Sequence, residues 1–241
     1  DPNLQNIPVR SDQGREIRKA FVARDEVHIL LAADYSQIEL RIAAALSEET
    51  AMIQAFREGF DIHTATAMRV FGVAEEEVTA DMRRQAKTVN FGILYGISAF
   101  GLAERSELSR VEAGALIESY FNEYPALKEW QERTIAFAHD HGYVETVTGR
   151  RRYLRDINSQ NATIRSASER NAINSPIQGS AADMIKIAMS RIMERFDTEG
   201  VRSKMLLQVH DELVFDLHRD ETDTVTELVR EIMEGALPLS V

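Results

Sequence analysis

The chain has 241 residues, of which 44% are hydrophobic and 28% charged, as expected for a globular protein with a sizeable core. It has no cysteine, which excludes disulfides and cysteine-bound zinc, and no apolar run near the roughly 20 residues that a membrane helix needs. The net charge of −11 argues against a nucleic-acid partner, but residues 145–195 hold nine Lys/Arg and only five Asp/Glu, so a basic surface remains compatible with the acidic total.

The first expected element is an extended loop over residues 1–21, where two prolines and polar turn residues occur. HILLAAD at 28–34 is typical of a buried strand, and residues 36–47 show helical spacing. Helical patterns then run from about 48 to 140 almost without interruption. Two of these helices have clear start signals, at Thr79 and Pro125.

The remaining expected elements are a short hairpin over 143–154, helices at 159–174 and 177–198 separated by Pro176, two strands within 206–217, and an amphipathic helix over 221–237. This order predicts an α+β fold whose sheet is built from segments distant in sequence, with a mainly helical subdomain inserted between them. The chain begins in a loop and stops at LPLSV, so we expect a piece of a longer protein.

Acidic residues stand at the ends of two predicted strands. Asp34 ends the first strand, and Asp211 and Glu212 lie between two apolar runs in LLQVHDELVFDL. Carboxylates that converge repel one another unless cations are present, and Mg²⁺ needs few protein carboxylates because it also binds substrate phosphates. The residues alone leave a simpler interpretation open, in which Asp34 caps a helix and the acidic pair forms an exposed turn.

A second pattern combines cations and aromatic rings. Arg83, Lys87, Phe91 and Tyr95 recur every four residues in DMRRQAKTVNFGILYG, so one helix stripe carries them along about 18 Å. Such a stripe suits a nucleoside triphosphate, with its phosphates at the cations and its base near the rings. The alternative is a surface helix whose aromatic residues pack inward.

Polar and basic residues could contact nucleic acid. Arg170, Asn174 and Gln178 recur at four-residue steps and could reach acceptors in a minor groove. Arg150 and Arg151 in GRRRYLR could contact the phosphate backbone without reading sequence. Each group could equally be an ordinary solvated surface.

Taken together, DYSQIELR, RRQAKTVNFGILYG and QVHDELVF resemble motifs A, B and C of the family A DNA polymerases, in the same order. PNLQNIP, DIHTATA, GRRRYL and NSPIQGSAADMIK also match that family. The resemblance implies an antiparallel palm sheet with flanking helices and an inserted, mainly helical fingers subdomain. It places the palm at residues 1–60 and 170–241 and the fingers at 61–169.

The resemblance also implies a role for each candidate residue. Asp34, Asp211 and Glu212 would form the catalytic group, with two Mg²⁺ ions bound by Asp34, Asp211 and the backbone carbonyl of Tyr35. The residues implied to hold the incoming nucleotide are Gln37, Glu39, His63, Arg83, Lys87, Phe91 and Tyr95, with Glu39 excluding a 2′-hydroxyl. Those implied to lie on the primer–template side are Arg150, Arg151, Arg170, Asn174, Gln178 and His210.

The implied function is template-directed DNA synthesis from deoxynucleoside triphosphates in DNA replication and repair, by a protein that is monomeric at full length. We expect a bacterial cytoplasmic, nucleoid-associated location and no membrane partner. Two other hypotheses remain open. Without thumb and exonuclease-like domains, the chain could be catalytically weak or only bind nucleotide and DNA. A two-metal nuclease would also need clustered carboxylates, although it gives no reason for the stripe of residues 83–95.

Overall fold

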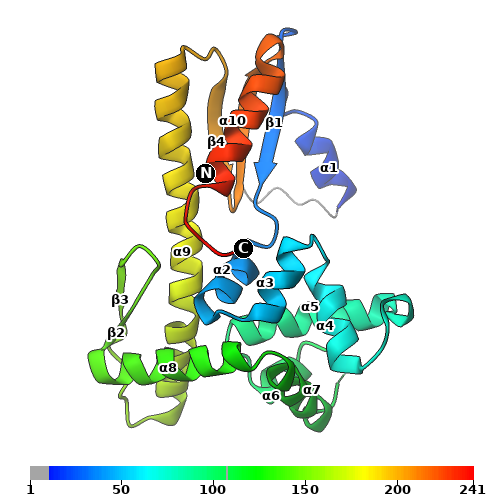
Figure 1. The fold of residues 1–241 in the computed structure, drawn as a ribbon, viewed down its shortest axis with the longest axis vertical. Coiled ribbons are helices and arrows are strands. Elements are labelled where there is room, and N and C mark those ends of the chain that lie inside the picture. The colour runs from blue at the N-terminus through cyan, green and yellow to red at the C-terminus, as the bar shows by residue number, and fades with distance from the viewer. Residues whose placement is uncertain (1–10, 107) are drawn as a thin grey trace. The chain divides into compact units, whose positions relative to one another are not determined.

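The structure is a computed structural model that describes residues 11–106 and 108–241. The PNLQNIP motif at residues 2–8 therefore lies outside the described residues. Internal contacts divide the chain into two compact units. We call residues 1–36 and 183–238 the sheet unit, and residues 37–182 and 239–241 the helical unit; Figure 1 labels their elements.

The sheet unit is built on three antiparallel strands in the order β1-β5-β4. Their bounds are His28–Asp34 for β1, Lys204–Val209 for β4 and Glu212–His218 for β5. The central strand β5 thus pairs with one strand near the start of the chain and with its own sequence neighbour. This confirms the predicted α+β class and the antiparallel sheet made from distant segments.

One face of this sheet is covered by helices. Phe215 of β5 lies with its ring centroid 6.1 Å from that of Phe196, on helix α9 (Ala162–Glu199), and helix α10 (Thr222–Glu234) also packs on β5 (Figure 1). Exposure along β1 alternates, and Leu30 is 39% exposed. The prediction of a fully buried β1 is therefore wrong, because an antiparallel sheet covered on one side buries only every second residue.

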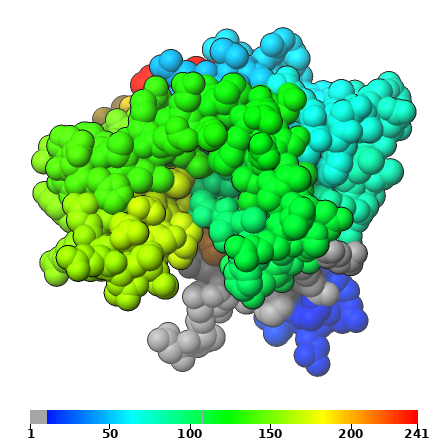
Figure 2. Space-filling view, turned by 90° about the horizontal axis from the view of Figure 1, so that it is seen from below, coloured from blue at the N-terminus to red at the C-terminus, as the bar shows by residue number. Residues whose placement is uncertain are grey.

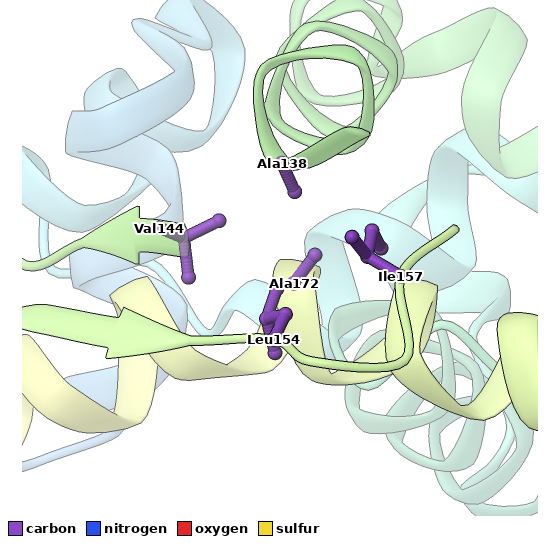
Figure 3. Close-up of a cluster of buried hydrophobic side chains, with 5 residues drawn as sticks. All are labelled: Ala138, Val144, Leu154, Ile157 and Ala172. Atoms are coloured by element: carbon purple, nitrogen blue, oxygen red, sulfur yellow. The ribbon is translucent and has the colours of Figure 1, made fainter. Parts of the chain in front are cut away.

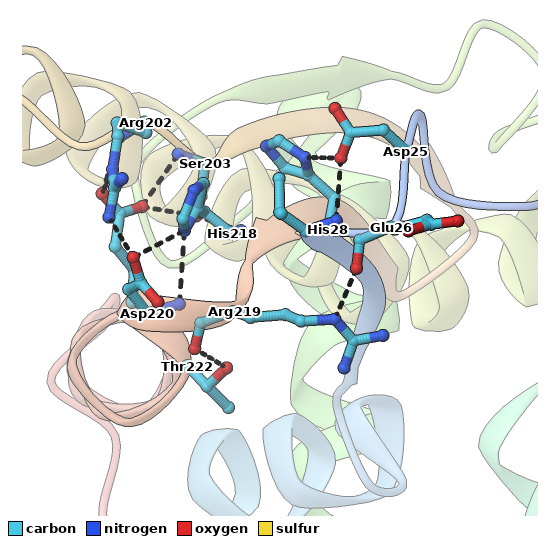
Figure 4. A network of polar contacts seen from close by, with 11 residues as sticks. Asp25, Glu26, His28, Arg202, Ser203, His218, Arg219, Asp220 and Thr222 are labelled. Atoms are coloured by element: carbon cyan, nitrogen blue, oxygen red, sulfur yellow. Dashed lines mark hydrogen bonds and ion pairs between the residues drawn. The ribbon is translucent and has the colours of Figure 1, made fainter.

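Polar contacts tie the strand ends of the sheet unit together (Figure 4). The His28 ring lies 2.6 Å from the Asp25 carboxylate and packs edge-on against the ring of His218, its partner in the β1–β5 register. The Ser203 hydroxyl accepts a hydrogen bond from the His218 N–H and donates one to Glu221. These contacts fix the β1–β5 pairing at the end of the sheet opposite Asp34.

Helix α1 (Asp12–Arg18) corrects the prediction of an extended loop over residues 1–21. The Ser11 hydroxyl accepts a hydrogen bond from the Gly14 N–H, and Asp12 lies in the first turn, where a negative charge is favourable. Within residues 11–21, this local capping signal outweighed the loop-like composition.

The helical unit contains the predicted run of helices between residues 37 and 141. Their bounds are α2 (Ile38–Ser47), α3 (Thr50–Arg57), α4 (Ile62–Phe71), α5 (Ala80–Leu94), α6 (Ala99–Ala103), α7 (Arg110–Glu123) and α8 (Pro125–His141). A short 3-10 turn at Glu75–Glu77 lies between α4 and α5, and another at Arg219–Glu221 belongs to the sheet unit. Thr79 caps α5 by accepting a hydrogen bond from the Met82 N–H, and Pro125 stands in the first turn of α8, both as predicted.

Helix α9 is continuous from Ala162 to Glu199, so the prediction of two helices separated by Pro176 is wrong. A proline inside a helix removes one hydrogen bond and costs about 3 kcal/mol. Here Ile173, Pro176 and Ile177 are all buried, and the apolar surface that they remove from water offsets this cost. Residues up to Ala182 belong to the helical unit and those from Asp183 to the sheet unit.

The predicted hairpin is confirmed as β2 (Tyr143–Glu145) and β3 (Arg151–Tyr153). A buried cluster attaches it to α8 and to the first half of α9, with side chains that converge in Figure 3: Ala138, Val144, Leu154, Ile157 and Ala172. Figure 2 shows α8 running along one face of the helical unit, with the hairpin and the start of α9 next to it.

The hairpin loop approaches α9 most closely at Gly179. A Cβ atom at this position would lie 2.5 Å from Cγ2 of Thr146, so only glycine fits without movement. The Gly179 carbonyl accepts a hydrogen bond from Arg150, and the hydroxyl of the next residue, Ser180, accepts one from the Val147 N–H. Arg150 is thereby held against the helix.

Candidate active site

Strand pairing brings the acidic residues to one end of the sheet unit. Asp34, the last residue of β1, pairs in register with Glu212, the first residue of β5. The Tyr35 N–H donates a hydrogen bond of 3.3 Å to the Asp211 carbonyl, which extends the pairing by one step. The three acids named from the sequence are therefore neighbours, although Asp34 lies 177 or more residues before the other two along the chain.

The stretch LLQVHDELVFDL turns out to be a tight hairpin. Val209 pairs with Glu212, which leaves His210 and Asp211 as a two-residue turn. His210 accommodates it with a φ of 55°, in the left-handed region that non-glycine residues seldom adopt. The turn interpretation and the carboxylate-site interpretation are thus compatible, since the turn is what presents Asp211 beside Asp34.

Burial and like charge both act on this group of carboxylates. Partial burial raises the pKa of Asp34, and the negative charges of Asp211 and Glu212 raise it further. Within the described residues, no three His, Cys, Asp or Glu side chains are arranged as a ready metal site. Asp34 and Asp211 supply carboxylate oxygens, the ligands of hard divalent cations such as Mg²⁺, which complete their coordination with substrate oxygens.

Tyr35 and Gln37 follow Asp34 directly. The Tyr35 hydroxyl donates a 2.7 Å hydrogen bond to the Met233 carbonyl of α10, and burial raises its pKa. This bond anchors the side chain and leaves the backbone of Tyr35 next to Asp211. Gln37 has a φ of 56° at the start of α2, and in the described part of the chain its buried amide oxygen has no hydrogen-bond partner.

Helix α5 carries the predicted stripe, with Tyr95 as its C-terminal cap. Arg83 and Lys87 are exposed and Phe91 is half-buried, whereas Ala86, Val89 and Ile93 on the opposite side are buried. The cationic part of the stripe is therefore exposed, and Phe91 is partly exposed and packs against the buried His63.

At the start of the stripe, Arg83 forms two hydrogen bonds of 2.8 and 3.1 Å with the carboxylate of Asp61. Burial would raise the pKa of Asp61, but the bonds from Arg83 and Thr64 outweigh burial and lower it to about 2. Sequence reasoning missed Asp61, although it belongs to the DIHTATA motif and is the N-cap of α4.

His63 lies next to this ion pair and is buried. Its ring centroid is 5.8 Å from that of Phe91, and its Nδ1 atom lies 3.0 Å from the Asn90 amide nitrogen. Burial lowers the pKa of His63, and the charges of Arg83 and Lys87 lower it further against the opposing effect of Asp61. The structure thus places His63 close enough to Arg83 and Lys87 for their charges to act on its ring.

At the other end of the stripe, three predicted residues from separate segments meet. The Tyr95 hydroxyl donates a hydrogen bond to the Glu39 carboxylate of α2 and also contacts the side chain of Gln178 on α9. Burial raises the pKa of Tyr95, and the hydrogen bond and negative charge of Glu39 raise it further. Glu39 is therefore held in one orientation by a neutral donor.

The remaining predicted residues lie on the hairpin, α9 and the β4–β5 turn. Arg151 bonds Glu145 at 2.7 Å and lies over the Tyr143 ring. Arg170 is exposed, with a 3.3 Å bond to Ser166. Asn174 has a buried amide oxygen without a hydrogen-bond partner in the described residues. The DNA-contacting roles of Arg150, Arg151, Arg170, Asn174, Gln178 and His210 stay predictions.

Comparison with known proteins identifies the class. The family model described as DNA polymerase family A matches residues 1–241, and the chain belongs to this family. Enzymes of this family are generally metal-dependent. No helix among the described residues has both the length and the apolar character needed to cross a membrane.

Curated relatives are named DNA polymerase I. The protein from Streptococcus pneumoniae serotype 4 is 54% identical over 242 residues, and that from Geobacillus stearothermophilus is 52% identical over 241 residues. Each match covers the whole of this chain but 28% of the relative, so the chain spans little more than a quarter of their length.

A solved structure, the POL domain of Pol1 from M. smegmatis in complex with DNA primer-template and dNTP, superposes with a TM-score of 0.94 at 46% identity. The match covers this entire chain and 42% of that one.

Proposed function

We propose that this protein is a DNA-directed DNA polymerase of bacterial replication and repair, acting in the cytoplasm as a monomer at full length. It would transfer a deoxynucleotidyl group from a triphosphate to a primer 3′-hydroxyl, with release of pyrophosphate. The observation that carries this proposal is the convergence of Asp34, Asp211 and Glu212 at one end of the sheet. Family membership and the primer-template and dNTP in the similar solved complex support it.

The carboxylates would hold two Mg²⁺ ions, through Asp34, Asp211 and the Tyr35 carbonyl, with Glu212 beside them. Such ions supply activation of the attacking oxygen and neutralisation of charge on the phosphates. The contribution of the chain is to bring together carboxylates that repel one another, as the raised pKa of Asp34 shows, so that cation binding relieves the repulsion.

The stripe on α5 would bind the nucleotide. Arg83 and Lys87 would take the triphosphate, which requires Arg83 to exchange the Asp61 carboxylate for phosphate oxygens. Phe91 would stack on the base, and Tyr95 would border the base pair being formed. Glu39, held by the Tyr95 hydroxyl, would occupy the space that a ribose 2′-hydroxyl needs. Gln37 would contact the sugar side of the same site.

We assign residues 1–60 and 170–241 to the palm and 61–169 to the fingers. On the DNA side, Arg170, Asn174 and Gln178 of α9 and His210 of the β4–β5 turn would contact the primer–template, while Arg150 and Arg151 of the hairpin would contact the phosphate backbone. Such contacts carry shape and charge rather than base sequence, as a template-directed enzyme requires.

Primer extension with Mg²⁺ and a labelled primer–template tests the proposal. Asp34→Asn and Asp211→Asn should each lower extension by several orders of magnitude, whereas Asp223→Asn, an exposed change on α10, should leave it unchanged. Extension by either active-site variant at the normal rate would refute the metal assignment. Shortening of the primer without added nucleotides would instead indicate a nuclease.

The binding-module hypothesis makes a different prediction for the same samples. A chain that binds a deoxynucleoside triphosphate, loses that binding in Lys87→Ala and never extends the primer would be a binding module. Sedimentation of the protein with and without primer–template gives its oligomeric state and its DNA affinity in one experiment.

A further inference from the structure

A buried chain of polar side chains runs through the helical unit to His63. Thr66 and Asn90 are fully buried, and Tyr124 and His63 are 1% and 3% exposed. The Thr66 hydroxyl oxygen lies 3.2 Å from the Tyr124 hydroxyl and 3.1 Å from the Asn90 amide oxygen, and the Asn90 amide nitrogen lies 3.0 Å from Nδ1 of His63. We call these four side chains the buried relay.

The direction of each hydrogen bond in the relay follows from counting hydrogens. Burial raises the pKa of Tyr124, so its hydroxyl keeps its hydrogen, and within residues 11–106 and 108–241 its hydrogen-bond partner is Thr66. If Tyr124 donates to Thr66, the single Thr66 hydrogen is free for the Asn90 carbonyl oxygen. Asn90 must then point its NH₂ group at Nδ1 of His63, which acts as acceptor.

The opposite orientation of Asn90 would break the relay. Its NH₂ group would donate to Thr66, and whichever of the Thr66 and Tyr124 hydroxyls donated to the other, one hydroxyl hydrogen would have no acceptor among the described residues. A buried unpaired donor costs free energy because its bond to water is lost. The relay therefore prefers the orientation in which Nδ1 of His63 carries no hydrogen.

We propose that Asn90, oriented by Thr66 and Tyr124, holds His63 in the tautomer with its hydrogen on Nε2, so that the ring offers a neutral N–H donor to the triphosphate. This inference rests on the proposed nucleotide site. In the other tautomer, Nε2 would present a lone pair, which repels phosphate oxygens. Asn90 is thus a positioning residue, because it acts only through His63.

The charged groups that face His63 agree with a neutral ring. Arg83 and Lys87 on α5 disfavour a positive charge there, and Asp61 at the start of α4 favours one but is paired with Arg83. Burial of the ring acts in the same direction as the two cations.

Nitrogen NMR of the ¹⁵N-labelled chain tests the tautomer directly, with the His63 signals assigned by their loss in His63→Gln. We expect a protonated Nε2 and a bare Nδ1. In Asn90→Asp the carboxylate can only accept, so Nδ1 should gain a hydrogen and the pKa of His63 should rise relative to the wild type. A wild-type ring protonated at Nδ1, or an unchanged ring pattern in folded Asn90→Asp, would overturn the inference.

A pair of variants covers the case in which Asn90→Asp does not fold. Thr66→Val removes the hydroxyl that donates to the Asn90 carbonyl oxygen, and it should give a mixture of tautomers. Tyr120→Phe removes an equally buried hydroxyl that has no hydrogen-bond partner in the described residues, and it should leave the wild-type pattern. The same tautomer in both variants would contradict the relay.

Binding of dATP with Mg²⁺ tests the link to the nucleotide. An equal mixture of tautomers halves the competent fraction, so Thr66→Val should bind about twofold more weakly than Tyr120→Phe. Equal affinities alongside different tautomers would show that His63 does not contact the triphosphate. The NMR result needs no polymerase activity, so failure of the proposed function and failure of the relay are distinguishable.

Discussion

Replacing Asp61 by asparagine removes one negative charge but keeps a side-chain oxygen at the start of α4. Asparagine is as good an N-cap as aspartate, so the hydrogen bond from the Thr64 N–H should survive. The pair of bonds from Arg83 loses its charge assistance. The substitution therefore isolates the Asp61–Arg83 ion pair from the capping of the helix.

The magnitude follows from the pKa of Asp61. Its fall from 3.8 to about 2 corresponds to at most about 2.5 kcal/mol of stability at neutral pH. The Thr64 bonds account for part of this and remain in the variant. Because the side chains of Asp61 and Arg83 are 32% and 49% exposed, solvent screens the rest, and we expect Asp61→Asn to lose about 1 kcal/mol.

Urea unfolding as a function of pH is the assay. The folded pKa of Asp61 is depressed, so its contribution is complete above pH 4 and is lost as pH falls from about 4 towards 2. The difference between wild type and Asp61→Asn should be constant from pH 5 to pH 8 and shrink below pH 4. Asp81→Asn, which breaks a more exposed pair with Arg84, should cost less than about 0.5 kcal/mol.

The same variant bears on nucleotide binding. If Arg83 must leave Asp61 to bind phosphate, Asp61→Asn should bind dATP with Mg²⁺ up to about fivefold more tightly, the equivalent of about 1 kcal/mol. Weaker binding would show that Asp61 instead orients Arg83 towards the nucleotide. A stability loss equal to that of Asp81→Asn, or one that does not shrink between pH 4 and pH 2, would refute the ion-pair argument.

Three further predictions concern other parts of the chain. Gly179→Ala should lower the free energy of unfolding in urea by about 1–3 kcal/mol, because the new Cβ would overlap Cγ2 of Thr146. Adding Thr146→Ser should restore most of this loss, since serine lacks that methyl group. Asp34→Asn should raise the melting temperature of the metal-free chain at pH 7 by about 1–3 °C, because the folded pKa of Asp34 is raised and its ionisation therefore opposes folding at this pH. A lower melting temperature would contradict the repulsion. Glu49→Ala should lower the free energy of chemical unfolding by about 2–3 kcal/mol, because the buried Glu49 carboxylate accepts hydrogen bonds from the N–H groups of Ala51 and Ala126 at the starts of α3 and α8. A loss below about 1 kcal/mol would rule this role out.

Sequence reasoning predicted the α+β class, most helices of the helical unit and the hairpin at 143–154, because these depend on local spacing, caps and turns. It also predicted which stripe of α5 carries Arg83, Lys87 and Phe91, since the geometry of one helix determines it. It failed for α1, where a capping signal was overlooked, and at Pro176, where burial compensates a locally unfavourable residue.

By itself, then, the sequence determined the identity of the candidate residues and their order along single elements. Only the tertiary structure decided that Asp34 faces Glu212, because a strand register depends on hydrogen bonds between segments far apart in the chain. It also decided that Asp61 binds Arg83 and that Asn90 reaches His63, two contacts between α5 and the start of α4. Side chains more than 20 residues apart meet only after packing, so no local pattern could specify them.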